Sequence, residues 1–176
     1  MPNNNDDDTN RLLEEECPGP VELESVLAND TLSDVETEAP LTVQATAPLS
    51  EAIRRMQDGR RGCALVIDDG KLAGIFTERD VLMKIAGHQV DIERALVGEY
   101  MTRAPVTLPA DSNVAYALHV MALEGFRHIP TVDDKGRPTG VVSMRDLMQY
   151  LTEFFSRDVL NLPPDPNITY RSREGA

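Results

Sequence analysis

One seven-residue pattern occurs twice in the chain, and this duplication restricts the possible folds more than any other feature. The first copy is Gly74-Ile75-Phe76-Thr77-Glu78-Arg79-Asp80 and the second is Gly140-Val141-Val142-Ser143-Met144-Arg145-Asp146. Each copy has a glycine, two apolar residues, a hydroxyl residue, a variable residue, an arginine and an aspartate. A pattern that recurs together with its surroundings indicates tandem structural units.

The match between the two regions extends well beyond the seven residues. An apolar stretch ending in two aspartates precedes each copy, at 63–69 and 128–134, and each leads through a turn with Lys and Gly, which predicts two β-hairpins. Farther upstream, apolar residues recur at i, i+3, i+4 and i+7 from Leu49 and from Val114, so two amphipathic helices are expected. With a short strand at 41–43, the pattern predicts an α/β fold of two βαββα repeats, each marginal as an independent core.

The regions around the repeats differ from them in composition. Residues 1–20 are polar and acidic, so we expect a disordered tail there. The first repeat is predicted at 21–96, and the apolar residues within 21–35 are expected to dock on it. The second repeat is predicted at 97–157. A proline cluster after it indicates an extended tail at 158–176.

The charge of the chain is unevenly distributed. The formal net charge is -13, but residues 1–40 hold 12 acidic residues and one Arg, so the repeat region is nearly neutral. An acidic chain of this kind argues against binding to nucleic acid, whereas a small phosphate ligand in a local arginine-lined cleft remains compatible with it. Two cysteines in dissimilar settings predict neither a disulfide framework nor a metal site. The sequence has no signal peptide and no apolar run long enough for a membrane span, so a soluble cytoplasmic protein is expected.

Two interpretations of the repeated motif compete. In the first, Thr77 and Ser143 are helix N-caps, and Asp80 and Asp146 at the third helical position bond back to the cap. Such a cap stabilises a helix by roughly 0.5–2 kcal/mol without any ligand. It leaves the glycine and the arginine of each copy unexplained. In the second interpretation, the helix N-terminus attracts a phosphate while the carboxylate accepts hydrogen bonds from ribose hydroxyls.

Two further segments carry a family resemblance. Met101-Thr102-x-x-Pro105-Val106-Thr107 leads into the second repeat, and Arg127-His128-Ile129-Pro130-Thr131-Val132-Asp133 begins its hairpin. With these segments and the duplicated motif, residues 25 to 157 resemble a tandem pair of CBS (cystathionine β-synthase) domains, known as a Bateman module. The resemblance implies two repeats packed through their sheets around a pseudo-two-fold axis, with two clefts that commonly bind adenosine ligands.

The resemblance also implies roles for single residues. Asp80 and Asp146 would hold ribose, and the hydroxyl and arginine residues of each motif would lie near ribose or phosphate. Arg127 and His128 stand where the family often places phosphate-binding side chains, which favours the cleft of Asp146, although a partly buried histidine without a ligand is nearly as good an interpretation of His128. The predicted nucleotide-binding residues are Thr77, Arg79, Asp80, Pro105, Val106, Arg127, His128, Ser143, Arg145 and Asp146.

The sequence has no recognisable catalytic set, because its histidines lack metal-ligand spacing and no P-loop or nucleophile elbow is present. We therefore expect a non-enzymatic regulatory module that binds AMP or ATP in preference to S-adenosylmethionine, with no required cofactor. A homodimer is expected because each helix has a single apolar face, and the regulated protein stays unidentified. The alternative is a structural dimerisation module whose motifs act only as helix caps.

Overall fold

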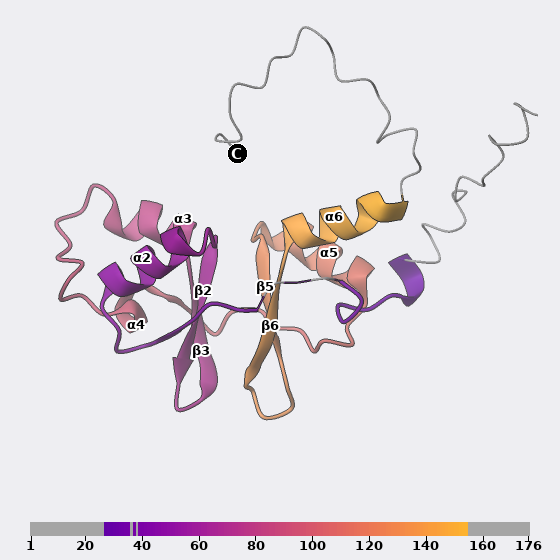
Figure 1. Cartoon of the computed structure of the whole chain (residues 1–176), viewed down its shortest axis with the longest axis horizontal. Coiled ribbons are helices and arrows are strands. Elements are labelled where there is room, and N and C mark those ends of the chain that lie inside the picture. The colour runs from indigo at the N-terminus through magenta and orange to yellow at the C-terminus, as the bar shows by residue number, and fades with distance from the viewer. Residues whose placement is uncertain (1–26, 36, 38, 155–176) are drawn as a thin grey trace, which may run out of the picture.

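The computed structural model describes residues 27–35, 37 and 39–154, and for Phe154 only the backbone. The predicted acidic tail and C-terminal tail lie outside these residues. In Figure 1 the two hairpins stand next to each other at the centre, and the helices of each repeat lie on the outer sides. Cys63, Leu65 and Ile75 of the first hairpin form a small buried cluster with Leu72, and Val141 of the second hairpin packs against it. The two sheets thus meet through apolar side chains.

The first repeat contains the predicted strand, helix, hairpin and helix. A four-stranded sheet has the order β1-β2-β3-β4, in which β1 and β2 are parallel and the other pairs are antiparallel. The elements are β1 (Thr42–Gln44), α2 (Leu49–Asp58), β2 (Cys63–Asp68), β3 (Lys71–Thr77), α3 (Glu78–Asp80), the π-helical segment η1 (Val81–Ile85) and, from the later chain, β4 (Thr102–Arg103). The predicted helix after the motif is present, but its second part is π-helical.

The second repeat repeats this order with a smaller sheet. The short helix α4 (Val97–Tyr100) precedes it, and its own elements are α5 (Val114–Glu124), β5 (His128–Val132), β6 (Pro138–Ser143) and α6 (Met144–Phe154). Strands β5 and β6 form an antiparallel pair. Leu108 makes a single parallel bridge to Thr131, at the place that β1 takes in the first repeat.

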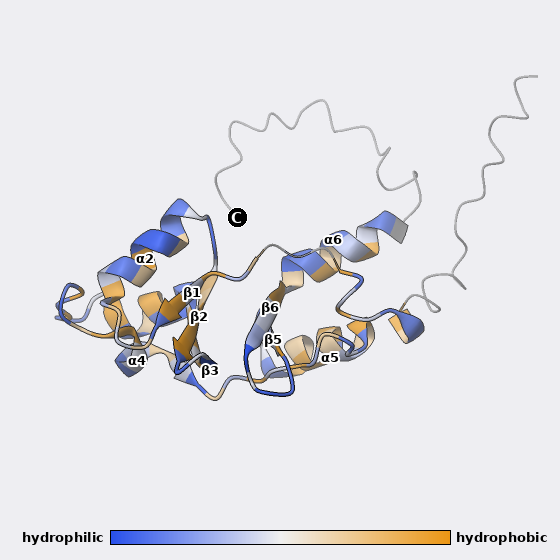
Figure 2. Ribbon diagram, turned by 60° about the horizontal axis from the view of Figure 1, so that its bottom comes forward, coloured by the Kyte–Doolittle hydropathy of each residue, from blue (hydrophilic) through white to orange (hydrophobic). Residues whose placement is uncertain are grey.

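The amphipathic pattern places the helices as predicted. Leu49, Ala52 and Met56 of α2 are buried in the first core, while the outer face of this helix is hydrophilic in Figure 2. In α5 the same spacing buries Val114 and Met121 in the second core. The first hairpin turns through two residues with positive φ, as a type I′ turn requires.

The segment that leads into the first repeat, residues 27–35, packs on the core of the second repeat. Leu32 and Val35 are buried there, and the backbone N–H of Leu32 donates to the carbonyl oxygen of Ser112 at 2.9 Å. The expectation that residues 21–35 dock on the first repeat is therefore wrong for their described part. The composition of a segment shows that it will be buried, but not which core will receive it.

The segment that leads into the second repeat, residues 95–103, makes the equivalent contact with the first. Val97 and Met101 are buried in the first core, and the backbone N–H of Val97 donates to the carbonyl oxygen of Ala47 at 2.9 Å. Val97 thus takes the place that Leu32 has in the other repeat. The two repeats exchange their leading segments, and this exchange brings residues 102–106 next to the first motif.

Candidate functional site

A cleft of about 380 Å³ lies between the two repeats. Its walls come from the N-terminus of α3, from the first hairpin, from the chain that follows β4 and from the corner between α5 and β5. The lining residues are Gly62, Ile75, Thr77, Glu78, Arg79, Asp80, Thr102, Ala104, Pro105, Val106, Glu124, Phe126, Arg127 and His128. Seven of the ten residues predicted to bind a nucleotide are among them.

The first motif forms a helix cap at one end of this cleft. The backbone N–H of Asp80 donates to Thr77 Oγ1 at 3.2 Å, while the backbone N–H of Thr77 donates to Asp80 Oδ2 at 2.9 Å. The Thr77 hydroxyl also donates to Asp80 Oδ2, at 2.7 Å. These contacts agree with the capping interpretation. The same residues line the cleft, so the capping and binding interpretations are compatible for this copy.

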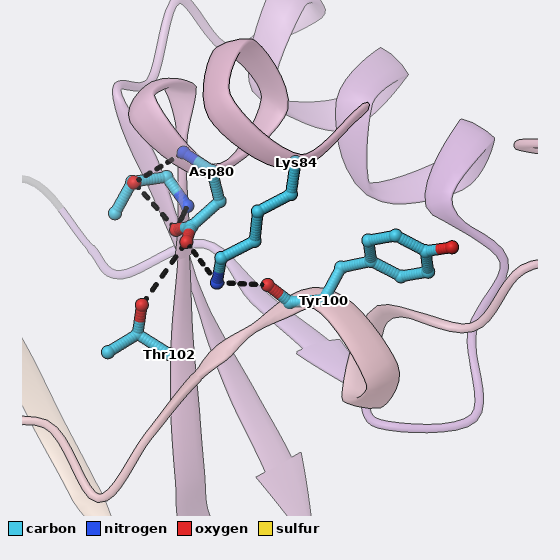
Figure 3. A network of polar contacts seen from close by, with 5 residues as sticks. Asp80, Lys84, Tyr100 and Thr102 are labelled. Carbon is cyan, nitrogen blue, oxygen red and sulfur yellow. Dashed lines mark hydrogen bonds and ion pairs between the residues drawn. The ribbon is translucent and has the colours of Figure 1, made fainter. Parts of the chain in front are cut away.

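Asp80 is the centre of a polar network that sequence reasoning did not predict (Figure 3). Its side chain is buried, yet Lys84 Nζ lies 2.6 Å from Asp80 Oδ1 and the Thr102 hydroxyl donates to the same oxygen at 3.2 Å. Lys84 Nζ also donates to the carbonyl oxygen of Tyr100 at 2.7 Å. Burial raises the pKa of Asp80, but the hydrogen bonds from Lys84 and Thr77 and the charge of Lys84 outweigh it, so that this pKa is lowered. Asp80 is therefore ionised at neutral pH.

The glycine of the first motif allows the chain before the second repeat to approach the sheet. A Cβ atom at Gly74 would lie 2.5 Å from Met101 Sδ and 2.7 Å from the carbonyl oxygen of Thr102. Strand β4 pairs with β3 at this point, through Gly74 and Ile75. The fixed glycine, which capping does not explain, is thus accounted for by close packing of β4.

Arg127 and His128 line the cleft that contains Asp80. His128 is also the cross-strand partner of Ser143, so their assignment to the cleft of Asp146 stays a prediction. A Cβ atom at Gly62 would lie 3.0 Å from His128 Nε2, which shows that the imidazole contacts the first repeat. The packing of the repeats places the corner between α5 and β5 opposite the first motif. Burial and the charge of Arg127 lower the pKa of His128, against opposing effects of Glu78 and Asp146.

The second motif lies outside the lining of this cleft. The backbone N–H of Ser143 donates to Asp146 Oδ2 at 2.8 Å, and the backbone N–H of Asp146 donates to the Ser143 hydroxyl at 3.2 Å. These are the two contacts of a helix cap at the start of α6. Arg145 is exposed on the same turn. The three residues predicted from this copy are thus together and outside the lining of the first cleft, although His128 of that cleft is the cross-strand partner of Ser143.

Several cleft residues were missed by sequence reasoning. Glu78 and Glu124 bring two further carboxylates to the cleft, and Phe126 brings an aromatic ring. Glu78 occupies the variable position of the motif, which gave no signal. The spacing of Lys84 four residues after Asp80 is that of a helical ion pair, and this signal was available in the sequence.

Neither a metal site nor a membrane span is found in the described part of the chain. Among residues 27–35, 37 and 39–154, His, Cys, Asp and Glu side chains form no group of three or more that could hold a metal ion. Within the same ranges, the helices are too short or too polar to cross a bilayer.

Comparison with known proteins identifies the domain type. A family model of the CBS domain matches residues 32–87 and 97–153. An uncharacterized 17.7 kDa protein of Acidianus ambivalens is 32% identical over 123 residues, which are 69% of this chain and 73% of that protein. The CBS domain-containing protein CBSCBSPB1 of Arabidopsis thaliana is 33% identical over 104 residues, 59% of this chain but only 19% of its own length.

Solved structures of CBS domains have the same fold. The CBS-domain protein ATU1752 of Agrobacterium tumefaciens is 27% identical with a TM-score of 0.61, over 68% of this chain and 97% of that one. At 20% identity and a TM-score of 0.63, CBSX2 in complex with AMP matches 70% of this chain and 97% of its own. The CBS pair of MJ0100, in complex with 5′-methylthioadenosine and S-adenosylmethionine, is 24% identical with a TM-score of 0.63. The match covers 70% of this chain and 97% of that one. The chain therefore belongs to the CBS domain family and contains two copies of this domain.

Proposed function

We propose that the protein is a non-enzymatic regulatory module that binds an adenine nucleotide, AMP or ATP in preference to S-adenosylmethionine, in the cleft between its repeats. The observation that carries this proposal is the cleft itself, in which the first motif lies opposite Arg127 and His128 of the second repeat. Two proteins of the same fold are described with adenosine ligands, which makes this ligand class the first one to test.

The lining of the cleft matches the parts of a nucleotide. Ile75, Pro105 and Val106 offer apolar contact for an adenine ring. The N-terminus of the helix that starts at Glu78 attracts a phosphate, as helix N-termini do in general. Arg79 supplies a guanidinium group for the same phosphate.

The charge of the cleft favours a short phosphate chain. Arg79 and Arg127 are its arginines, whereas Glu78 and Glu124 are additional carboxylates in the same lining. A triphosphate would bring more negative charge near these carboxylates than a monophosphate, and like charges repel most strongly in a partly buried cleft. Among the two nucleotides, AMP is therefore the preferred ligand of this cleft.

Isothermal titration calorimetry of the full chain with AMP, ATP and S-adenosylmethionine, at one fixed salt concentration, tests the proposal. We expect saturable binding of AMP, weaker binding of ATP and weakest binding of S-adenosylmethionine. Tighter binding of S-adenosylmethionine than of AMP would contradict the phosphate assignment. No binding of any of the three at millimolar concentration would contradict the proposed function as a whole.

A second candidate function is a structural dimerisation module without a ligand. It is favoured by the capping contacts at both motifs, which satisfy Thr77 and Ser143 without any bound molecule. The calorimetric titrations distinguish the two functions, because a purely structural module gives no heat of binding with any of the nucleotides, while light scattering on the same samples tests the dimer that both functions include. The proposed nucleotide-binding module is also a homodimer, regulates a protein that is not identified, and is located in the cytoplasm.

A further inference from the structure

The carboxylate of Asp80 already accepts as many hydrogen bonds as it can. Oδ2 accepts from the backbone N–H and the hydroxyl of Thr77, and Oδ1 accepts from the Thr102 hydroxyl and from Lys84. An ionised carboxylate has about four lone-pair sites in total. A ligand hydroxyl can therefore bind this carboxylate only by replacing one of the four present donors.

The contact with Thr102 is the one that a ligand can replace. At 3.2 Å it is the longest of the four, and its donor is a neutral hydroxyl on an exposed residue. Lys84 is a charged donor at 2.6 Å and is not among the residues that line the cleft. The contact from the Thr77 backbone belongs to the helix cap, and the Thr77 hydroxyl, at 2.7 Å, is closer to the carboxylate than the Thr102 hydroxyl. Thr102 lines the cleft, so its hydroxyl is on the side from which a ligand arrives.

The backbone of Thr102 is held by the sheet, whereas its side chain is held by the hydrogen bond to Asp80. Thr102 pairs with Ile75 in the sheet, and its carbonyl oxygen would lie only 2.7 Å from a Cβ atom at Gly74. Side chains of exposed residues change rotamer within picoseconds to nanoseconds. Rotation of the Thr102 side chain would therefore free an acceptor on Asp80 without movement of β4.

We propose that the Thr102 hydroxyl is a placeholder for a ribose hydroxyl, so that ligand binding in this cleft competes with the Thr102 to Asp80 hydrogen bond. This inference rests on the proposed function and adds to it the residue that limits affinity. The second repeat has no such competitor among the described residues, since the Asp146 carboxylate accepts only from the backbone of Ser143. Affinity at the first motif is thus reduced by a contact within the protein.

Substitution of Thr102 by valine tests the inference, because valine has nearly the same shape and lacks the hydroxyl. In calorimetric titrations with AMP and with adenosine, Thr102→Val should bind both about tenfold more tightly than the unmodified chain, which corresponds to ~1.4 kcal/mol. Thr102→Ser keeps the hydroxyl and should bind like the unmodified chain. Thr46→Val, at an exposed threonine outside the cleft, is the matched control for the change of residue type and should have no effect.

The outcomes separate this inference from the proposed function. Unchanged or weaker binding by Thr102→Val, with AMP still bound by the unmodified chain, would overturn the placeholder role only. Failure of both chains to bind AMP and adenosine would overturn the proposed function together with the inference. Thermal unfolding of each variant shows whether a change in affinity reflects loss of the fold. If Thr102→Val is destabilised, Thr102→Ala, which also lacks the hydroxyl, takes its place and should bind more tightly by a similar factor.

Discussion

Asp80 and Asp146 occupy the same position in the two repeats, but their surroundings differ. Both carboxylates accept from the backbone of the preceding hydroxyl residue, as helix caps do. Asp80 is buried and paired with Lys84. At the position of Lys84 the second repeat has Tyr150, whose hydroxyl donates to Asp30 instead. One duplicated motif thus supports two local structures, because the residue one helical turn later decides what the carboxylate contacts.

The largest expected effect is the loss of stability in Asp80→Ala. This change removes a cap and leaves the Lys84 ammonium without its carboxylate, so the free energy of unfolding should fall by about 3 kcal/mol. Asp146→Ala removes a cap only and should reduce it by about 1 kcal/mol. Urea denaturation of both variants measures the two values. Equal losses would show that the Lys84 ion pair adds nothing and that the two motifs are energetically alike.

Replacement of the motif glycine by alanine should also reduce the free energy of unfolding more in the first motif than in the second. Gly74→Ala places a methyl group against Met101 and the backbone of Thr102, so a loss of about 2 kcal/mol is expected from overpacking. At Gly140 the nearest atom is the side-chain oxygen of Thr131, at 2.9 Å. A side chain can move more easily than a backbone, so Gly140→Ala should be less destabilising. Chemical denaturation of Gly74→Ala and Gly140→Ala measures the two losses in free energy of unfolding. A larger loss for Gly140→Ala would contradict the packing argument.

Arginine substitutions sharpen the comparison between the motifs for nucleotide binding. Arg127→Ala should weaken AMP binding about tenfold, or ~1.4 kcal/mol, because Arg127 lines the cleft. Arg145→Ala changes an exposed arginine outside that lining and is the matched control. Calorimetric titration of both variants with AMP provides the measurement. A larger effect of Arg145→Ala would show that the nucleotide binds at the second motif.

The smallest expected effect is a pH dependence from His128, which begins the hairpin of the second repeat where Cys63 begins that of the first. The pKa of His128 is lowered in the folded state, so the unfolded chain binds more protons just below the ordinary histidine pKa. Stability should therefore fall as the pH drops from 6.5 toward the folded pKa of His128. Glu78 and Asp146 limit this effect, whereas Arg127 increases it. The urea concentration at the midpoint of unfolding should therefore decrease as the pH is lowered from 6.5. This decrease should be smaller in His128→Gln.

Local patterns in the sequence were sufficient for the elements and the caps. The helical spacing from Leu49 and the alternation around the hairpins specify contacts between residues close in the chain, and these predictions are confirmed. The contact of Arg127 and His128 with the first motif depends on how two complete repeats pack together. No local pattern encodes that packing, so this contact with the first motif was not predicted. The pairing of Asp80 with Lys84 was within reach, since both residues lie on one helical turn.

The exchange of leading segments has a consequence for synthesis on the ribosome. The core of the first repeat includes Val97 and Met101, so it cannot be completed until the chain beyond β4 has left the ribosomal exit tunnel. The second repeat has the opposite situation, because Leu32 and Val35 are made long before the core that they complete. Until then these apolar residues are exposed and available to chaperones. A chain cut between the repeats would give two halves that each lack a part of their own core.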